Sequence, residues 1–276
     1  MATAKRKPAN PALIEDLVAA NRILSNEGVV DGFGHVSVRH DGKAGVFLLA
    51  RSMAPGLVTA ADIMEFGADG EPLGGDRRTA YVERFIHSEI YNALPRVTAI
   101  VHSHSPAVIP FGVTDAKLRP IYHMSSFLGG DVPVFEIRDT GGDATDMLIR
   151  TPQLGAALAH SLGEATVALM RGHGNVVVGR SLPEVVFRAV YTEANARLQA
   201  DALRLGDGRV TYLSDGEAAA SMASRSAVTA APPMSSVSST AKSTRCCRKS
   251  PRSCTAIRRR SSRSASLRRS SARSTT

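Results

Sequence analysis

Two histidines separated by one residue, His102 and His104, directly follow the largely apolar run 97–101. On an extended strand, residues i and i+2 point to the same side, with Cα atoms about 6.5–7 Å apart. Two imidazoles at that separation can bind one cation through bonds of about 2.0–2.1 Å. The pair therefore predicts a metal site at the end of a strand. The alternative is two histidines that face solvent in a loop.

A third histidine, His173, stands between Gly172 and Gly174, after the apolar run 166–170. Glycines on both sides permit unusual backbone angles and let other groups approach closely. Three imidazoles with one open coordination position are typical of a catalytic metal site, because a structural site needs a fourth protein ligand. All three cysteines lie after residue 245, so the preceding part of the chain offers no thiolate ligand. The alternative is a glycine turn with an incidental histidine.

A carboxylate, Glu83, is the next candidate for chemistry. It falls within a predicted helix over residues 79–94, with His87 one turn later on the same side. The alternative is an ordinary solvated helix face, which the neighbouring Arg84 favours.

Hydrophobic periodicity predicts the elements that position these residues. Helices are expected over 11–27, 79–94, 153–162 and 183–205, and a short turn or helix over 59–63. Strands are expected over 35–39, 45–50, 64–66, 97–102, 165–170 and 175–178, the first two as a hairpin. Helices that alternate with short strands indicate one α/β or α+β domain over residues 11–215, after a flexible N-terminus of residues 1–10.

The net charge of +9 is unevenly distributed over the 276 residues. Residues 216–276 hold 13 of the 34 basic residues and one of the 25 acidic ones, so the preceding part is slightly acidic. This Ser/Arg-rich segment has no aromatic residue and no periodic apolar face, and we expect a disordered tail. An RNA-binding arm is the alternative, but nucleic acid is not the expected partner of the protein.

Membrane insertion and secretion are not expected. The mean hydropathy is −0.06, and no apolar run approaches the roughly 18 residues of a membrane span. The basic N-terminal patch is not followed by the apolar segment of a secretory signal. We therefore expect a cytoplasmic protein.

Four separated motifs together resemble the class II aldolase/adducin family. They are Gly-His-Val-Ser-Val-Arg at 34–39, Glu-Arg-Phe-Ile-His at 83–87, His-Ser-His at 102–104 and Gly-His-Gly at 172–174. The resemblance implies a single α/β/α domain around a mostly antiparallel sheet, in a homotetramer with active sites near the subunit interfaces. It also implies that His102, His104 and His173 bind one divalent metal ion. Glu83 would carry a proton or occupy the open metal position.

The chain departs from the sugar-phosphate aldolases of this family at their phosphate site. His35 stands where they have Asn, and Tyr81-Val82 stands where they have a Ser pair. A phosphate pocket needs several small donors and backbone amides. Arg51 together with imidazoles instead suits a carboxylate. A sugar phosphate is therefore not the expected substrate.

The 34–39 motif and the run Leu-Leu-Ala-Arg-Ser-Met-Ala-Pro-Gly-Leu-Val at 48–58 are similar to one branch of the family. This branch decarboxylates hydroxylated aromatic or pyridine dicarboxylates such as 3,4-dihydroxyphthalate. The resemblance then implies Glu83, His35 and His123 as proton carriers and Arg51 and Ser52 as substrate-binding residues. His123 falls where aldolases place an active-site tyrosine, and the alternative for it is a structural role. His40, His87 and His160 are expected to be structural or solvated.

Zinc suits three imidazoles, with manganese or iron as alternatives. Two other functions stay open: an aldolase for a non-phosphorylated hydroxy-oxo acid, and a non-catalytic adducin-like interaction domain.

Overall fold

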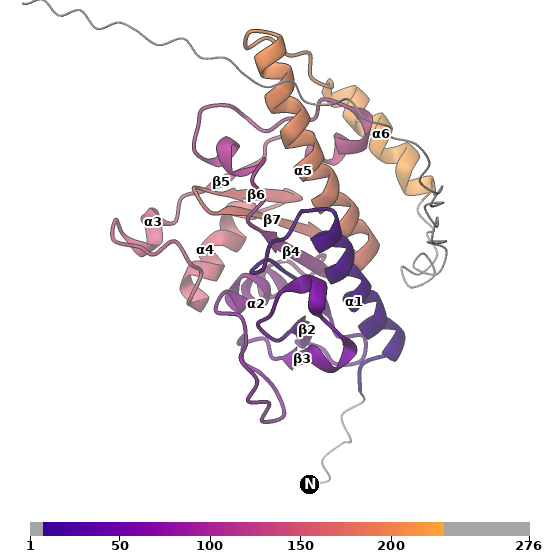
Figure 1. Cartoon of the computed structure of the whole chain (residues 1–276), viewed down its shortest axis with the longest axis vertical. Helices are drawn as coiled ribbons and strands as arrows, with labels where there is room; N and C mark the ends of the chain where they lie inside the picture. Colours follow the sequence, from indigo (N-terminus) through magenta and orange to yellow (C-terminus); the bar gives the residue numbers. More distant parts are fainter. Residues whose placement is uncertain (1–7, 229–276) are drawn as a thin grey trace, which may run out of the picture. The chain divides into compact units, whose positions relative to one another are not determined.

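A seven-stranded β-sheet forms the centre of the computed structural model, which describes residues 8–228 (Figure 1). The strands are β1 (His35–Arg39), β2 (Phe47–Ala50), β3 (Ile63–Phe66), β4 (Ala99–Ser103), β5 (Val134–Phe135), β6 (Val167–Met170) and β7 (Gly174–Gly179). Their order is β3-β2-β1-β4-β7-β6-β5, and all neighbours are antiparallel except β5 and β6. The predicted mostly antiparallel sheet is confirmed.

Helices cover both faces of this sheet. The α-helices are α1 (Pro11–Asn26), α2 (Arg84–Ala93), α3 (Arg138–Gly141), α4 (Pro152–Leu162), α5 (Leu182–Leu205) and α6 (Asp215–Val228). Short 3-10 helices are η1 (Pro55–Leu57), η2 (Ala60–Asp62), η3 (Ile109–Gly112) and η4 (His123–Leu128). Helices α1 and α5 pack together against one face, and α2 and α4 pack together on the other. The result is the α/β/α domain that the family resemblance implies.

Two hydrophobic clusters separate the layers, and strand alternation assigns residues to them. Val36 and Val101 belong to the cluster with α1 and α5, whereas Ile86 of α2 and Ile100 of β4 belong to the other. Successive side chains on a strand point to opposite faces. Residues 35 and 37 of β1 and residue 102 of β4 therefore lie on the face that α2 covers.

The helix predicted over 79–94 begins only at Arg84, so its predicted start is wrong. The carbonyl of Thr79 accepts a hydrogen bond from the backbone of Ser52, and the Tyr81 hydroxyl donates to the Met53 carbonyl. These bonds hold residues 79–82, which precede α2, against the chain that follows β2. Glu83 is consequently the residue before the helix, with φ −88° and ψ 21°, instead of a mid-helix residue.

Helix α6 corrects the prediction of a disordered tail over 216–276, because it continues to residue 228. Its start is capped reciprocally: the Glu217 carboxylate accepts from the Ser214 backbone at 2.8 Å, and the Ser214 hydroxyl accepts from the Glu217 backbone at 3.2 Å. Asp215 adds negative charge to the first turn, and Ala218 is only 4% exposed. The rest of the predicted tail, with its cysteines, lies outside the described residues, as do residues 1–7.

Among the helices of residues 8–228, none combines the length and the apolar character that crossing a bilayer requires.

Candidate metal centre

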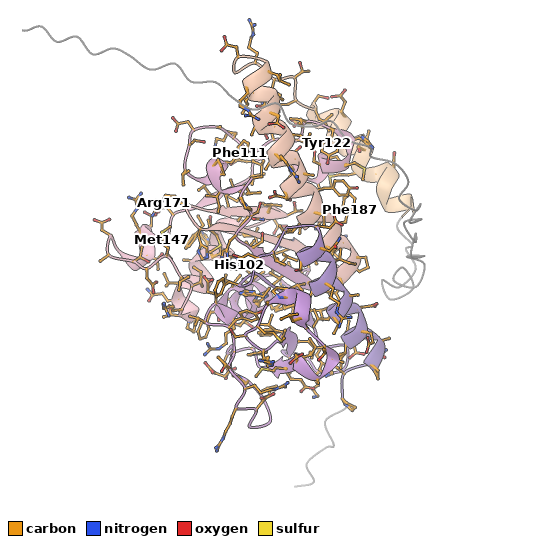
Figure 2. All side chains as sticks on the ribbon, in the orientation of Figure 1. His102, Phe111, Tyr122, Met147, Arg171 and Phe187 are labelled. Carbon is orange, nitrogen blue, oxygen red and sulfur yellow. The ribbon has the colours of Figure 1, made fainter. Side chains whose placement is uncertain are left out.

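Four side chains that are distant in the sequence meet at one end of β4. Glu83, His102, His104 and His173 each offer a ligand atom, and these atoms all lie within 4.8 Å of one another. Glu83 precedes α2, His102 and His104 lie at the end of β4, and His173 lies in the turn before β7. We call these four residues the cluster. His102 marks it near the middle of the molecule in Figure 2.

The spacing of the imidazole nitrogens suits a shared ion. The Nε2 atoms of His102 and His104 are 3.3 Å apart, and those of His104 and His173 are 3.1 Å apart. Two nitrogens bound to one ion at about 2.1 Å are about 3.0 Å apart at a right angle and about 3.4 Å apart at the tetrahedral angle. The observed separations fall within that range.

Backbone carbonyls orient two of the three rings. His102 Nδ1 lies 3.2 Å from the carbonyl oxygen of Asn175, and His173 Nδ1 lies 2.9 Å from that of Met147. A carbonyl oxygen only accepts a hydrogen bond, so each Nδ1 carries the hydrogen and each Nε2 keeps its lone pair. A second hydrogen bond of this kind is the usual support of a metal-bound histidine.

Asp31 supports the third ring, and sequence reasoning missed it. Its Oδ2 lies 3.1 Å from His104 Nδ1, while its Oδ1 accepts from the backbone of Phe33 at 2.8 Å and of Gly34 at 2.9 Å. Burial opposes the ionised form, but these bonds outweigh it and hold the pKa of Asp31 below its ordinary value. The Asp31-Gly32 pair could have indicated a turn, but nothing in the sequence pointed to His104.

The glycines beside His173 provide the unusual backbone angle and the close approach that the sequence indicated. Gly172 has φ +64°, a left-handed conformation that favours glycine. A Cβ on Gly174 would collide with the backbone carbonyl of Ser103, so only glycine lets β7 approach β4 this closely. The turn can therefore carry His173 back toward His102.

Glu83 is buried, with 7% of its surface exposed, which excludes a solvated helix face. Its Oε1 accepts from the backbone of Ile149 at 2.9 Å, and its Oε2 lies 3.5 Å from Nε2 of both His102 and His173. Burial would raise the pKa of Glu83, but the two histidines outweigh burial and keep that pKa far below its ordinary value. Burial lowers the pKa of His102, whereas Glu83 outweighs burial at His173 and raises the pKa of that ring.

His35 lies beside the cluster. It is 2% exposed, and its ring centroid is 5.1 Å from that of His102 and 4.5 Å from that of Tyr81. Its Nδ1 is 2.7 Å from Nε2 of His87, which is fully buried and therefore structural, as one of its two predicted roles requires.

The remaining predicted site residues are outside the cluster. Arg51 Nε donates to Asp62 at 2.8 Å, and the Ser52 backbone bonds to Thr79. His123 is exposed at the start of η4, and neighbouring Tyr122 lies well away from His102 in Figure 2. Within one chain, the structure does not bring His123 to the other predicted proton carriers.

The cluster fits a divalent metal ion on the chemistry of its donors. Three bare nitrogen lone pairs at 3.1–3.3 Å repel one another unless a positive charge lies among them. An ionised, buried carboxylate adjoins them and needs the same charge. His102, His104 and His173 would hold the ion, and Glu83 would stand at its open side.

Comparisons with known proteins show the family to which the chain belongs. The class II aldolase and adducin N-terminal domain matches residues 15–200. Decarboxylase tropJ of Talaromyces stipitatus is 41% identical over 213 residues, which are 71% of this chain and 80% of that protein. The 3,4-dihydroxyphthalate decarboxylase of Arthrobacter keyseri is 29% identical over 220 residues, which are 74% and 84% of the two chains.

A solved L-fuculose 1-phosphate aldolase from Glaciozyma antarctica PI12 superposes with a TM-score of 0.64 at 25% identity, covering 79% of this chain and 86% of that one. The chain belongs to the class II aldolase and adducin family. The relatives named above are decarboxylases and an aldolase, and they bear out the resemblance found in the motifs. It is a lyase.

Proposed function

We propose that this chain is a metal-dependent decarboxylase of a hydroxylated aromatic dicarboxylate such as 3,4-dihydroxyphthalate. The convergence of Glu83 and three histidines within 4.8 Å carries the proposal. The decarboxylases named above support the reaction, and one of them acts on this substrate. Zinc is the expected ion for three imidazole ligands, with manganese or iron as alternatives.

Decarboxylation leaves an electron pair on the carbon that held the carboxylate. The bound ion would stabilise the resulting charge on a neighbouring substrate oxygen as a Lewis acid. Glu83, ionised at rest, would take up at Oε2 the proton that a substrate hydroxyl releases on binding and pass it to the ring carbon as CO2 leaves, and solvent would reprotonate the hydroxyl oxygen. Oε2 faces the cluster, while Oε1 is held by the Ile149 backbone. His35, packed against His102, is the second proton carrier of the proposal.

Arg51 would hold the carboxylate that the product retains. Only its Nε is hydrogen-bonded within residues 8–228, so its two Nη atoms remain available for a substrate. Burial raises the pKa of Tyr81, and the Arg51 charge opposes this rise; the Tyr81 ring in turn packs against His35. This supports Arg51 as a residue that meets the substrate. Ser52, the next residue, would supply a further polar contact. His123 keeps no role here within one chain.

A sugar phosphate stays the less suitable substrate. Tyr81, at the position of the aldolase Ser pair, is buried and bonded through its hydroxyl to the Met53 carbonyl. It fills space that a phosphate site would need for small donors. The resemblance to an L-fuculose 1-phosphate aldolase nevertheless keeps aldol cleavage, on a non-phosphorylated hydroxy-oxo acid, as the second candidate.

A homo-oligomer, expected to be a tetramer with sites near subunit interfaces, is part of the proposal. Phe33 is 74% exposed and lies in the same turn as Asp31, which supports His104. A large exposed aromatic side chain beside a site suits burial by a partner surface. Light scattering coupled to gel filtration tests the assembly, and a stable monomer would contradict this part.

One assay separates the candidate functions. Purified protein is analysed for metal and incubated with 3,4-dihydroxyphthalate, with CO2 release measured, and with a 4-hydroxy-2-oxo acid, with pyruvate measured. We expect CO2 release that chelation abolishes and a divalent metal restores. Pyruvate formation without CO2 release would favour the aldolase. Neither product, from protein with no bound metal, would favour an adducin-like interaction domain.

A further inference from the structure

A continuous row of buried polar groups leads from the cluster to the far end of helix α2. His35 Nδ1 is 2.7 Å from His87 Nε2, and His87 Nδ1 is 2.6 Å from Ser37 Oγ. Ser37 Oγ is 2.8 Å from the Tyr91 hydroxyl, which lies 3.3 Å from the carbonyl oxygen of Thr98. We call His35, His87, Ser37 and Tyr91 the relay.

The relay follows from two simple periodicities. His35 and Ser37 are two residues apart on β1, so both point to the face that α2 covers. His87 and Tyr91 are four residues apart on α2, so both point back to that face. Each strand residue thus meets a helix residue, and all four are at most 5% exposed.

In each hydrogen bond between two relay residues, either group can be the donor, but the choice in one bond determines the choice in the next. Every link contains one shared hydrogen, so the direction at one end sets the tautomer of each imidazole along the row. The Thr98 carbonyl only accepts, and the Tyr91 hydroxyl has a single hydrogen. Only when Tyr91 donates to Thr98 is every one of the four close contacts a hydrogen bond. The opposite direction leaves the Tyr91–Thr98 contact without a hydrogen.

With Tyr91 donating to Thr98, the remaining directions follow. Ser37 donates to Tyr91, His87 donates from Nδ1 to Ser37, and His35 donates from Nδ1 to Nε2 of His87. Burial lowers the pKa of His87 to about 3, so this ring is neutral, as the direction requires. Nε2 of His35 keeps its lone pair, and no hydrogen bond to this atom forms within the described part of the chain.

We propose that Ser37, His87 and Tyr91 are positioning residues that fix the tautomer of His35, so that its Nε2 faces a bound substrate as a hydrogen-bond acceptor. The ligand group it selects is a hydroxyl, which donates to it. On the proposed function, on which this step rests, that group is the ring hydroxyl beside the leaving carboxylate. Through the relay, Tyr91 affects which substrate binds, although it is three hydrogen bonds away from His35.

Neutron diffraction from crystals of the metal-loaded protein in D2O tests the tautomer directly. In the wild type we expect deuterium on Nδ1 of His35 and none on Nε2. Tyr91→Phe removes the acceptor of Ser37, which then donates to His87 and reverses the relay, so deuterium should move to Nε2 of His35. Deuterium on Nε2 in both proteins would overturn the proposal, because the relay would then run the other way and ignore Tyr91.

A second variant covers the case in which Tyr91→Phe does not fold. Ser37→Ala interrupts the relay one link earlier, and we expect deuterium shared between both nitrogens of His35. An unchanged wild-type pattern would overturn the proposal. Ser88→Ala is the matched control, because Ser88 is a buried serine next to His87 on α2 whose hydroxyl has no hydrogen-bond partner within residues 8–228. It should leave the His35 tautomer unchanged.

Kinetics then link the tautomer to the substrate. Tyr91→Phe should lower kcat/KM for 3,4-dihydroxyphthalate by about 10- to 100-fold, the value of a lost hydrogen bond to a reacting group, while metal content stays at the wild-type level. A reversed tautomer with unchanged kinetics would overturn the role in substrate choice. Because the neutron experiment needs no substrate, an inactive wild type with the expected tautomer would refute the proposed function and leave the relay intact.

Discussion

Two groups of histidines lie side by side, and their hydrogen-bond partners differ in kind. In the cluster, each Nδ1 faces a group that only accepts: two carbonyl oxygens and the Asp31 carboxylate. In the relay, His35 and His87 face each other and Ser37, and all of these groups can donate or accept. The cluster therefore has its three lone pairs fixed locally, while the relay takes its direction from Tyr91.

The difference shows how one fold prepares imidazoles both for metal binding and for contact with a substrate hydroxyl. A cation site needs free lone pairs on its Nε2 atoms. Partners that only accept provide this, because they keep the ring hydrogen on Nδ1. A group that meets a substrate hydroxyl needs one defined tautomer, which a coupled row of hydroxyls and imidazoles can set from a distance. The predictions below test whether the two groups are as different as their partners indicate.

Removal of one cluster ring should have the largest effect. In His173→Ala, the two remaining imidazoles cannot hold the ion against chelation, so metal analysis should find little bound metal. CO2 release should fall by more than the about 10²–10³-fold that loss of one stabilising donor costs. His160→Ala, which removes an exposed histidine on α4, is the control. Wild-type metal content in His173→Ala would exclude this ring as a ligand.

Glu83→Gln separates the carboxylate from the rings. Glutamine keeps an oxygen for the Ile149 backbone, so the fold and the bound metal should be retained. Proton delivery should be lost, lowering kcat by about 10²–10⁴-fold. Kinetics combined with metal analysis checks this: full activity would remove Glu83 from the reaction. Loss of the metal would instead make Glu83 a ligand.

Local periodicity predicted the helices and strands well, while the resemblance to the family implied their arrangement in layers. Strands such as β1 and helices such as α5 stand within a few residues of their predicted bounds. The start of α2 was predicted wrongly, because hydrogen bonds to residues 52 and 53 outweigh the helix propensity of residues 79–82. Helix α6 was missed because the composition of the whole tail concealed a capped, alanine-rich start.

For the site, the sequence predicted the groups that carry chemistry but not the groups that hold them. The three histidines stand out through strand ends and glycines, and the structure brings them together with Glu83. Asp31 and the carbonyls of Met147 and Asn175 carry no signal in the sequence, since backbone acceptors are common to all residues. The relay was equally hidden, because Ser37 and Tyr91 are ordinary strand and helix residues until the register aligns them.

Asp31→Asn gives His104 of the cluster a partner that can donate or accept a hydrogen bond, as the partners in the relay can. The asparagine side chain can turn either its oxygen or its NH2 group toward His104, so the ring is no longer held by an acceptor alone. We expect metal affinity to fall by about 10- to 100-fold, as for other second partners of metal-bound histidines, with the fold intact. Competition with a chelator of known affinity measures this. An unchanged affinity would show that the ring needs no such support.

The last prediction concerns stability and comes from the relay. The pKa of His87 is about 3 in the folded protein, because of burial, against 6.5 in the unfolded chain. Between these values only the unfolded chain binds the proton, so the free energy of unfolding falls as the pH is lowered from about 6 to 4. A single group contributes about 1.4 kcal/mol per pH unit in that window.

His87→Gln should reduce this slope by about 1.4 kcal/mol per pH unit, because glutamine does not titrate. Urea unfolding of the metal-free protein at several pH values and one fixed protein concentration measures the slope. His160→Gln is the matched control, since it makes the same substitution at an exposed histidine on α4. Equal slopes in wild type and His87→Gln would mean that His87 is protonated in the folded protein, and the neutral relay that contrasts with the cluster would then be wrong.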